Sequence, residues 1–311
     1  MRKIGLILLI MGIVASGCEK IIDISVPDQE RKIVLNSVLN PDSLISVQLT
    51  RSKSVLEDNQ TVAIEDAELR LYEDGNFIAN LDYSGYSFYK LDDFYPSIEK
   101  KYRIEVDHSV LASVDAEVLM PPQVPILEVD TSRYQDQDEN ERYSLNVKIS
   151  DPGGVENYYA LSLAVTSRVF DWNTQELTDS LETFMIYFHT VEEGESLGGD
   201  LFNQDVNHFI DDKLFISDGV FDGQDHEFAL AIDYYFLEFQ SDTIILDVRL
   251  DHIDPSYYYY SVSKQKYYRA NGSPFSEPVQ VYNNINNGFG ILSSYTRSSR
   301  QYVIDISDTR E

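Results

Sequence analysis

Short segments in which apolar and polar residues alternate recur along most of this chain, and they limit its fold more than any other feature. Residues 67–72 and 143–149 alternate strictly, which is the period of a β-strand with one buried face. Asp74-Gly75 follows the first of these runs, and Asp-Gly before a second apolar run is the strongest short-range hairpin signal. The chain is therefore predicted to be mainly β.

A proline-rich segment divides the predicted strands into two groups. Three of the residues 120–125 are prolines, which makes a stiff, extended connector that cannot lie inside a sheet. About seven short strands precede it at the spacing of a sandwich. We predict an immunoglobulin-like or transthyretin-like β-sandwich over 31–120, a linker over 121–125 and a larger β-rich domain over 126–311. The chain length also allows a single large all-β body.

The second group contains one helix signal, near residues 255–270. Asp254 can cap the helix, Pro255 suits its first position, and Gly272 suits its end. Tyrosines and Lys264 share one face of this helix, which can either pack on a sheet or contact a ligand. The other predicted elements of this group are a long surface loop and five strands, at 192–212 and at 143–149, 158–165, 243–250, 290–293 and 302–306.

The N-terminus has the composition of an export signal. Arg2 and Lys3 precede an apolar run of about eleven residues, and small residues follow it. This run is about half the ~20 residues that a membrane-spanning helix needs. Residues 1–17 are therefore predicted to be a cleaved signal peptide, and residues 18–30 a polar tether.

Cys18 is the single cysteine of the chain. It cannot form an internal disulfide, so an exported chain that keeps it has another use for it. The segment Ala15-Ser-Gly-Cys18 resembles a bacterial lipobox, in which the cysteine accepts a diacylglycerol. Cys18 is predicted to be lipidated; the alternative is an incidental cysteine beside an ordinary cleavage site.

The charge of the chain excludes two kinds of partner. A net charge of −29 repels nucleic acid and anionic lipid head groups. The many tyrosines, 22 in all, fit half-buried strand positions or surfaces that contact a glycan or a peptide. We expect no nucleic-acid partner.

Acidic residues give one weak metal candidate. Asp218, Asp222 and Asp225 surround Gly219 and Gly223, but their spacing differs from the calcium-loop pattern and no bidentate glutamate follows. A β-turn rich in Asp and Gly explains them as well. No nucleophile elbow, phosphate loop or zinc spacing is present in the sequence. We therefore expect no cofactor and no enzymatic activity.

Several motifs resemble one family. They are Cys18-Glu-Lys-Ile-Ile-Asp23, Asp151-Pro-Gly, Asn157-Tyr-Tyr159, Phe215 to Gly223, Phe275-Ser-Glu-Pro278 and Asn283-Asn-Ile-Asn-Asn-Gly-Phe-Gly-Ile291. The chain is similar to the Bacteroidota lipoprotein family catalogued as domain of unknown function 4249. The resemblance covers essentially the whole mature chain and assigns no catalytic residues.

This resemblance implies a setting. Members are typically encoded beside TonB-dependent receptors, which implies an accessory or ligand-binding lipoprotein of the outer membrane, active in nutrient uptake. Its ligand would be a glycan, a peptide or a small molecule. The alternatives are a structural or adhesive surface lipoprotein and an enzyme acting on an envelope polysaccharide or peptide.

Overall fold

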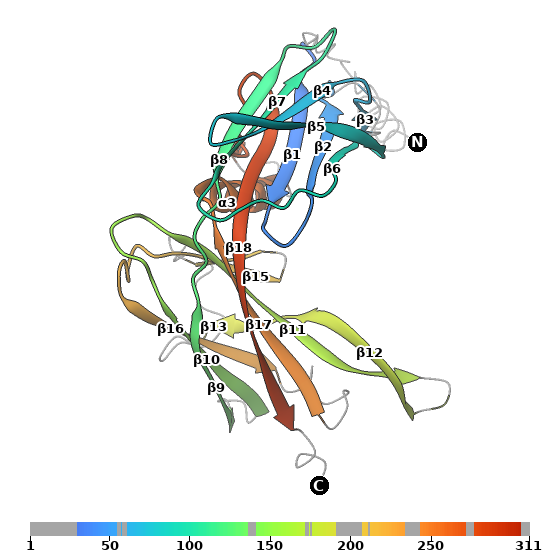
Figure 1. Ribbon diagram of the computed structural model, residues 1–311. Helices are drawn as coiled ribbons and strands as arrows, with labels where there is room; N and C mark the ends of the chain where they lie inside the picture. The colour runs from blue at the N-terminus through green and yellow to red at the C-terminus, as the bar shows by residue number, and fades with distance from the viewer. Residues whose placement is uncertain are drawn as a thin grey trace, which may run out of the picture.

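A computed structural model describes residues 30–54, 57, 61–135, 141–171, 174, 176–190, 207–210, 212–233, 243–271 and 277–305. In these ranges the chain is mainly β, with a single helix among the strands, as the alternation predicts. The strands form two bodies, one above the other in Figure 1, which we call the N-terminal and C-terminal sandwiches. The predicted signal peptide, Cys18 and nearly all of the predicted tether lie outside the described residues.

The N-terminal sandwich encloses one core between two groups of strands that share β5. One group has the order β18-β1-β2-β6-β5, with β3 beside β2, and the other has the order β5-β4-β7-β8. Side chains of β1 alternate between buried and partly exposed, so Ile33 and Leu35 reach the core while Val34 does not. The strands are β1 Ile33–Leu39, β2 Ile45–Arg51, β3 Val62–Ala63, β4 Glu68–Glu73, β5 Asn76–Gly85, β6 Phe88–Leu91, β7 Lys101–Asp107 and β8 Val114–Leu119.

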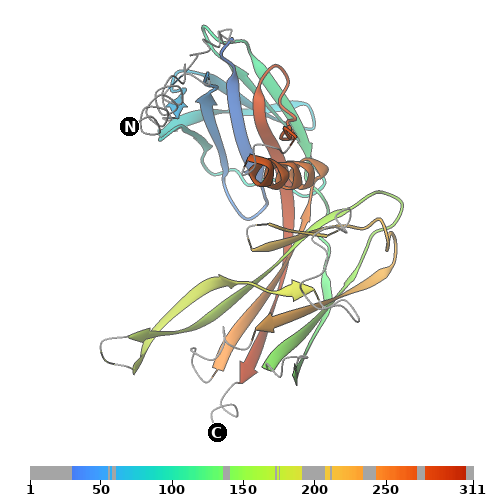
Figure 2. The ribbon, with the colours of Figure 1, turned by 180° about the vertical axis from the view of Figure 1, so that it is seen from behind.

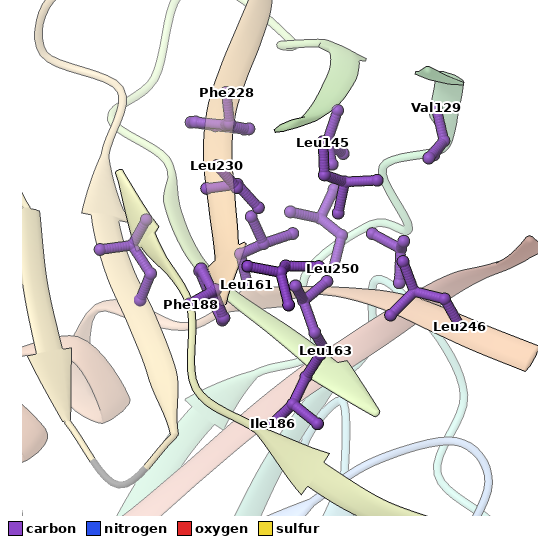
Figure 3. Close-up of a cluster of buried hydrophobic side chains, with 14 of the residues drawn as sticks. Val129, Leu145, Leu161, Leu163, Ile186, Phe188, Phe228, Leu230, Leu246 and Leu250 are labelled. Carbon is purple, nitrogen blue, oxygen red and sulfur yellow. The ribbon is translucent and has the colours of Figure 1, made fainter. Parts of the chain in front are cut away.

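The C-terminal sandwich has a larger sheet and a smaller one. The larger has the order β14-β15-β11-β17-β18, with β12 on the far part of β11, and the smaller has the order β13-β16-β10-β9. Leucines of both sheets meet between them, among them Leu145, Leu161, Leu230 and Leu250 (Figure 3). The strands are β9 Ile126–Gln135, β10 Glu141–Ser150, β11 Tyr158–Asp171, β12 Glu176–Ile186, β13 His189–Thr190, β14 Asn207–Ile210, β15 Lys213–Ser217, β16 Asp225–Asp233 and β17 Thr243–Ile253.

One strand, β18 (Phe289–Asp305), belongs to both sandwiches (Figure 1). Its first part runs parallel to β1, from the pair Val34 and Phe289 to the pair Leu39 and Ser294. From Tyr295 onward it runs antiparallel to β17. The two bodies are therefore joined by a continuous hydrogen-bonded sheet of fourteen strands in the described part of the chain.

This strand corrects the predicted domain boundary. We expected residues 126–311 to form a separate domain, but Ile285 and Leu292 pack into the core of the N-terminal sandwich. The predicted strands 290–293 and 302–306 are parts of β18, whose last described residue is Asp305. The reason is that a parallel pair between segments about 250 residues apart leaves no local pattern in the sequence.

A smaller correction concerns the predicted loop over 192–212. Asn207–Ile210 in that range forms β14, which pairs with β15. A four-residue strand at a sheet edge carries too few positions to show alternation. Residues 191–206 and 211 lie outside the described residues.

The parallel pair with β1 depends on two glycines. At Gly290, φ is +111°, and an added Cβ would lie 2.0 Å from the carbonyl oxygen of Leu35. At Gly288, a Cβ would lie 2.8 Å from the carbonyl oxygen of Ile33. Only a residue without a side chain allows β18 to approach β1 this closely.

The predicted helix is present as α3, Pro255–Asn271. As predicted, Asp254 caps it: its Oδ2 accepts a hydrogen bond from the backbone N–H of Ser256 at 2.8 Å. Its Oδ1 accepts another from the N–H of Ser294 in β18, also at 2.8 Å. Burial raises the pKa of Asp254 to about 6. The cap therefore also fixes the helix to β18, across the junction of the two sandwiches (Figure 2).

The proline-rich connector runs between β8 and β9, outside both sheets, and hydrogen bonds hold it along β18. The carbonyl oxygen of Pro122 accepts a hydrogen bond from Thr296 Oγ1 at 2.9 Å and lies 2.7 Å from Nδ1 of the buried His252. Ser294 Oγ donates to the carbonyl oxygen of Leu119 at 2.9 Å. The connector is therefore a second fixed contact between the sandwiches.

The close approach of β18 to β1 gives a test by substitution. We expect Gly290→Ala to lower the free energy of unfolding by at least about 3 kcal/mol, because the new Cβ meets backbone and the positive φ is strained. The matched control is Gly75→Ala, where φ is also positive (+80°) but no atom lies within 4 Å of the added Cβ. That variant should lose only about 1 kcal/mol. Urea unfolding followed by circular dichroism measures both, and equal losses would contradict the role of Gly290.

Candidate functional site

Two loops of the C-terminal sandwich bring acidic residues together. The first, Asp151 to Asn157, connects β10 to β11, and the second, Asp218 to Gln224, connects β15 to β16. Carboxylate oxygens of Asp151, Asp218 and Asp222 lie within 4.8 Å of one another. We call these three residues the acidic cluster.

The cluster corrects the predicted metal candidate in one position. Asp218 and Asp222 are close together as predicted, but Asp225 begins β16 and forms an ion pair with Lys148 at 3.2 Å. Asp151 takes its place. It is far away in the sequence, and its Asp-Pro-Gly-Gly context indicated only a turn.

Hydrogen bonds from the loops already reach each carboxylate. Asp218 Oδ2 accepts bonds from the backbone N–H and the side-chain amide of Asn157, at 2.7 and 3.0 Å. Asp151 accepts one from the N–H of Gly223 at 2.8 Å and one from the hydroxyl of Tyr159. Burial raises the pKa of Asp218. Through these bonds the acidic cluster holds the two loops together.

Glycines let the two loops touch. A Cβ added at Gly153 would lie 2.8 Å from the Cα of Gly223. Gly154 donates its N–H to Asp222 Oδ1 at 3.0 Å. The oxygen chemistry of the three carboxylates suits a hard cation such as calcium, but calcium takes six to eight oxygens. The contacts observed account for the cluster as loop structure.

A second site lies where the two sandwiches meet. A cleft of about 170 Å³ is bounded by β1, β14, β15, α3 and β18. We call it the junction cleft. Its lining residues are Val38, Ile210, Lys213, Phe215, Tyr257, Tyr260, Ser261, Lys264, Ile291 and Ser293. A hollow of about 470 Å³ continues from it along α3, sharing Ile210 and Lys264 and adding Gln265, Tyr268 and Arg269.

A charge network around the buried Asp251 supports one wall of the junction cleft. Asp251 has no exposed surface, and its carboxylate receives Lys213 Nζ at 3.0 Å and Arg297 Nε and Nη2 at 2.6 and 2.9 Å. Burial alone would lower the pKa of Lys213, but Asp251 raises it above its usual value, so the ammonium stays charged. One carboxylate is shared by two cations, which leaves one net positive charge.

Lys264 adds a second positive charge on the helix side. Its Nζ lies 6.0 Å from the ring centroids of Tyr260 and of Tyr268, one helical turn away on either side. In the described part of the chain, no carboxylate oxygen lies within 4.0 Å of it. The cleft is therefore a positively charged place on a strongly acidic protein.

The helix face predicted to carry tyrosines and Lys264 lines the cleft. Tyr257 also packs against the larger sheet, as predicted, but Tyr258 and Val262 form the main buried contact with it. Sequence reasoning missed Lys213, Asp251 and Arg297. Asp251 and Arg297 are direct cross-strand partners, but their pairing becomes visible only when β17 and β18 are known to be neighbours.

The fold and these sites define the class of protein as a two-sandwich β-protein whose bodies share one strand, with a cationic cleft at their junction. Within that class, the chain belongs to the family described as domain of unknown function (DUF4249), whose model matches residues 19–301. The predicted membership of this domain family is thereby confirmed. No curated protein matches the sequence. No helix in the described part of the chain is both long and apolar enough to span a bilayer.

The hydrogen bonds of the acidic cluster can be tested by substitution. A control comes from Asp225, which the sequence placed in the metal candidate but which lies outside the cluster. We expect Asp218→Ala to lower the free energy of unfolding by about 2 kcal/mol, because the buried N–H of Asn157 loses its acceptor. Asp225→Ala removes an exposed ion pair and should cost about 0.5 kcal/mol or less. Urea unfolding measures both, with a calcium salt and with a chelator. If Asp218→Ala lost more free energy of unfolding with calcium than with the chelator, and Asp225→Ala lost the same in both, the acidic cluster would instead be a cation site.

Proposed function

We propose that this chain is a lipid-anchored outer-membrane protein that binds a ligand in the junction cleft and serves a TonB-dependent receptor in nutrient uptake. The junction cleft is the observation that carries the binding role. It gathers Lys213 and Lys264 beside apolar and tyrosine side chains, on a chain whose net charge is −29. Pockets of this kind, mostly apolar with a few placed polar groups, are typical ligand sites.

The construction of the cleft also favours binding. Its walls come from both sandwiches and from α3, and these parts are tied together by β18, Asp254 and the proline-rich connector. Polar groups held by rigid elements lose little entropy when a ligand binds. A purely structural or adhesive role would not need a cationic cleft at this position.

The tether part of the proposal rests on the N-terminal sequence. A charged start, a short apolar run and the single Cys18 fit export followed by lipidation. Acyl chains contribute about 0.8 kcal/mol per buried CH₂, and stable anchoring takes more than one chain. The receptor partner rests on the family resemblance, whose members are typically encoded beside TonB-dependent receptors.

Lipidation can be tested at a single sulfur atom. We expect Cys18→Ala to release the protein from membranes as a folded, soluble chain, because the variant has no thiol to accept the diacylglycerol. Detergent phase partitioning compares it with the wild type, and circular dichroism checks its fold. Cys18→Ala that still enters the detergent phase by itself would contradict the lipid tether.

The receptor partnership needs a separate experiment. We expect the wild-type protein, extracted in mild detergent and purified by an affinity tag, to retain a TonB-dependent receptor, identified by mass spectrometry. An unrelated lipoprotein with the same tag from the same cells is the control. Recovery without that receptor, or equal recovery with the control, would contradict the proposed partnership.

A further inference from the structure

We propose that the junction cleft binds a monocarboxylate with a compact apolar body. This inference rests on the proposed binding function and adds the chemical class of the ligand. Two sources share this chemistry: a free organic acid, and the carboxyl terminus of a peptide that ends in an apolar residue.

The charges of the cleft favour an anionic ligand. Lys213 donates one hydrogen bond to Asp251, and an ammonium group has three donors, so others can reach a ligand. Asp251 cannot neutralise both Lys213 and Arg297, and Lys264 has no described carboxylate within 4.0 Å. A ligand carboxylate between the two ammonium groups would therefore relieve an excess of positive charge in a partly desolvated place.

The apolar lining favours a ligand with a compact apolar body. Val38, Ile210, Phe215 and Ile291 supply side chains without polar groups, from four different strands. The volume of the cleft itself, about 170 Å³, is close to that of an engineered cavity of about 150 Å³ that binds benzene, and the hollow along α3 leaves room beyond it. A six-membered ring or a branched aliphatic group fits this space.

None of the described residues that line the cleft is a carboxylate that could pair with a ligand ammonium group. The carboxylate next to the cleft belongs to Asp251, which is fully buried and already accepts three hydrogen bonds. Asp212, which precedes Lys213 in the β14–β15 turn, does not line the cleft. A free amino acid would bury its ammonium without a counter-charge, which is costly. The ligand is therefore an acid whose amine is absent or distant.

The arginine in the network is not free to bind the ligand. A guanidinium fork binds carboxylate and phosphate oxygens bidentately, but Arg297 already uses Nε and Nη2 to hold Asp251. The two lysines remain as single point charges. Each can donate to one oxygen of a ligand carboxylate, and the phenyl phosphate probe below separates a carboxylate from a phosphate.

Calorimetry on the mature chain with Cys18→Ala, which keeps every cleft residue, tests the ligand class. The probes are 3-phenylpropionate, its neutral amide, phenyl phosphate, the peptide N-acetyl-Gly-Gly-Phe and the same peptide with an amidated terminus. We expect the two carboxylates to bind and the two amides to bind about tenfold more weakly or not at all. Binding of the peptide acid alone assigns the site to chain termini, and binding of phenylpropionate assigns it to free acids. Equal binding of acids and amides, or tighter binding of phenyl phosphate, would overturn the proposal.

Two pairs of variants locate the binding. Lys264→Gln should weaken carboxylate binding about tenfold, whereas Lys266→Gln, on the exposed side of α3 and outside the cleft, should leave it unchanged. Val38→Trp should block the cleft, whereas Val110→Trp, at a position that is 84% exposed in a distant loop, should not. Binding that survives both Lys264→Gln and Val38→Trp would overturn the site. A negative result in these binding experiments does not change the outcome of the receptor co-purification. The ligand proposal and the receptor proposal can therefore fail separately.

Discussion

The parallel pairing of β18 with β1 is the interaction on which the rest of the structure depends. Through it, one strand of seventeen residues passes from the N-terminal sandwich into the C-terminal one without leaving the hydrogen-bonded sheet. Gly288 and Gly290 make the approach possible. Two sandwiches linked only by the proline-rich connector would move relative to each other. The shared strand turns their meeting place into a fixed surface, and a fixed surface can carry a binding site.

The side-chain amide of Asn284 shows how this meeting place is completed. Its Oδ1 accepts the N–H of Leu292 at 3.0 Å, and its Nδ2 donates to the carbonyl oxygen of Leu292 at 2.7 Å. The side chain therefore pairs with β18 as a neighbouring strand would. It also donates to Ser256 Oγ at the start of α3, at 3.1 Å. Strand, helix and preceding loop are held by one residue.

Burying the carboxylate of Asp251 is an expensive way to hold strands together. Taking charged groups out of water costs several kcal/mol each, and apolar side chains of similar size often stabilise a core as well or better. Asp251, Lys213 and Arg297 come from β17, β15 and β18, so apolar residues could have filled these positions. The cost becomes intelligible if the positive charge of Lys213 is needed at the wall of the junction cleft.

The sequence predicts what is local and misses what is distant. Alternation in 67–72 and 143–149 predicted strands that are present, and Asp254 and Pro255 predicted the start of α3. The acidic cluster was half predicted: Asp218 and Asp222 are close in the sequence, whereas Asp151 lies in another loop. Of the junction cleft, the sequence predicted only the helix face that carries the tyrosines and Lys264. Its charge network depends on which strands are neighbours, and hydrophobic periodicity does not encode that order.

The motifs through which the chain resembles its family act mainly on the frame. The hydrogen bonds that hold the two loops together come from Asp151, Asn157, Tyr159, Asp218 and Gly223. The motif over 283–291 shapes the contact of β18 with β1 and α3. Phe215 and Ile291 of the junction cleft belong to those motifs, whereas Val38, Lys213 and Lys264 lie outside them. Family membership therefore predicts the two-sandwich frame and the presence of a junction. Under the proposed function, the side chains that line the cleft select the ligand, and these must be compared directly before a function is carried from one member to another.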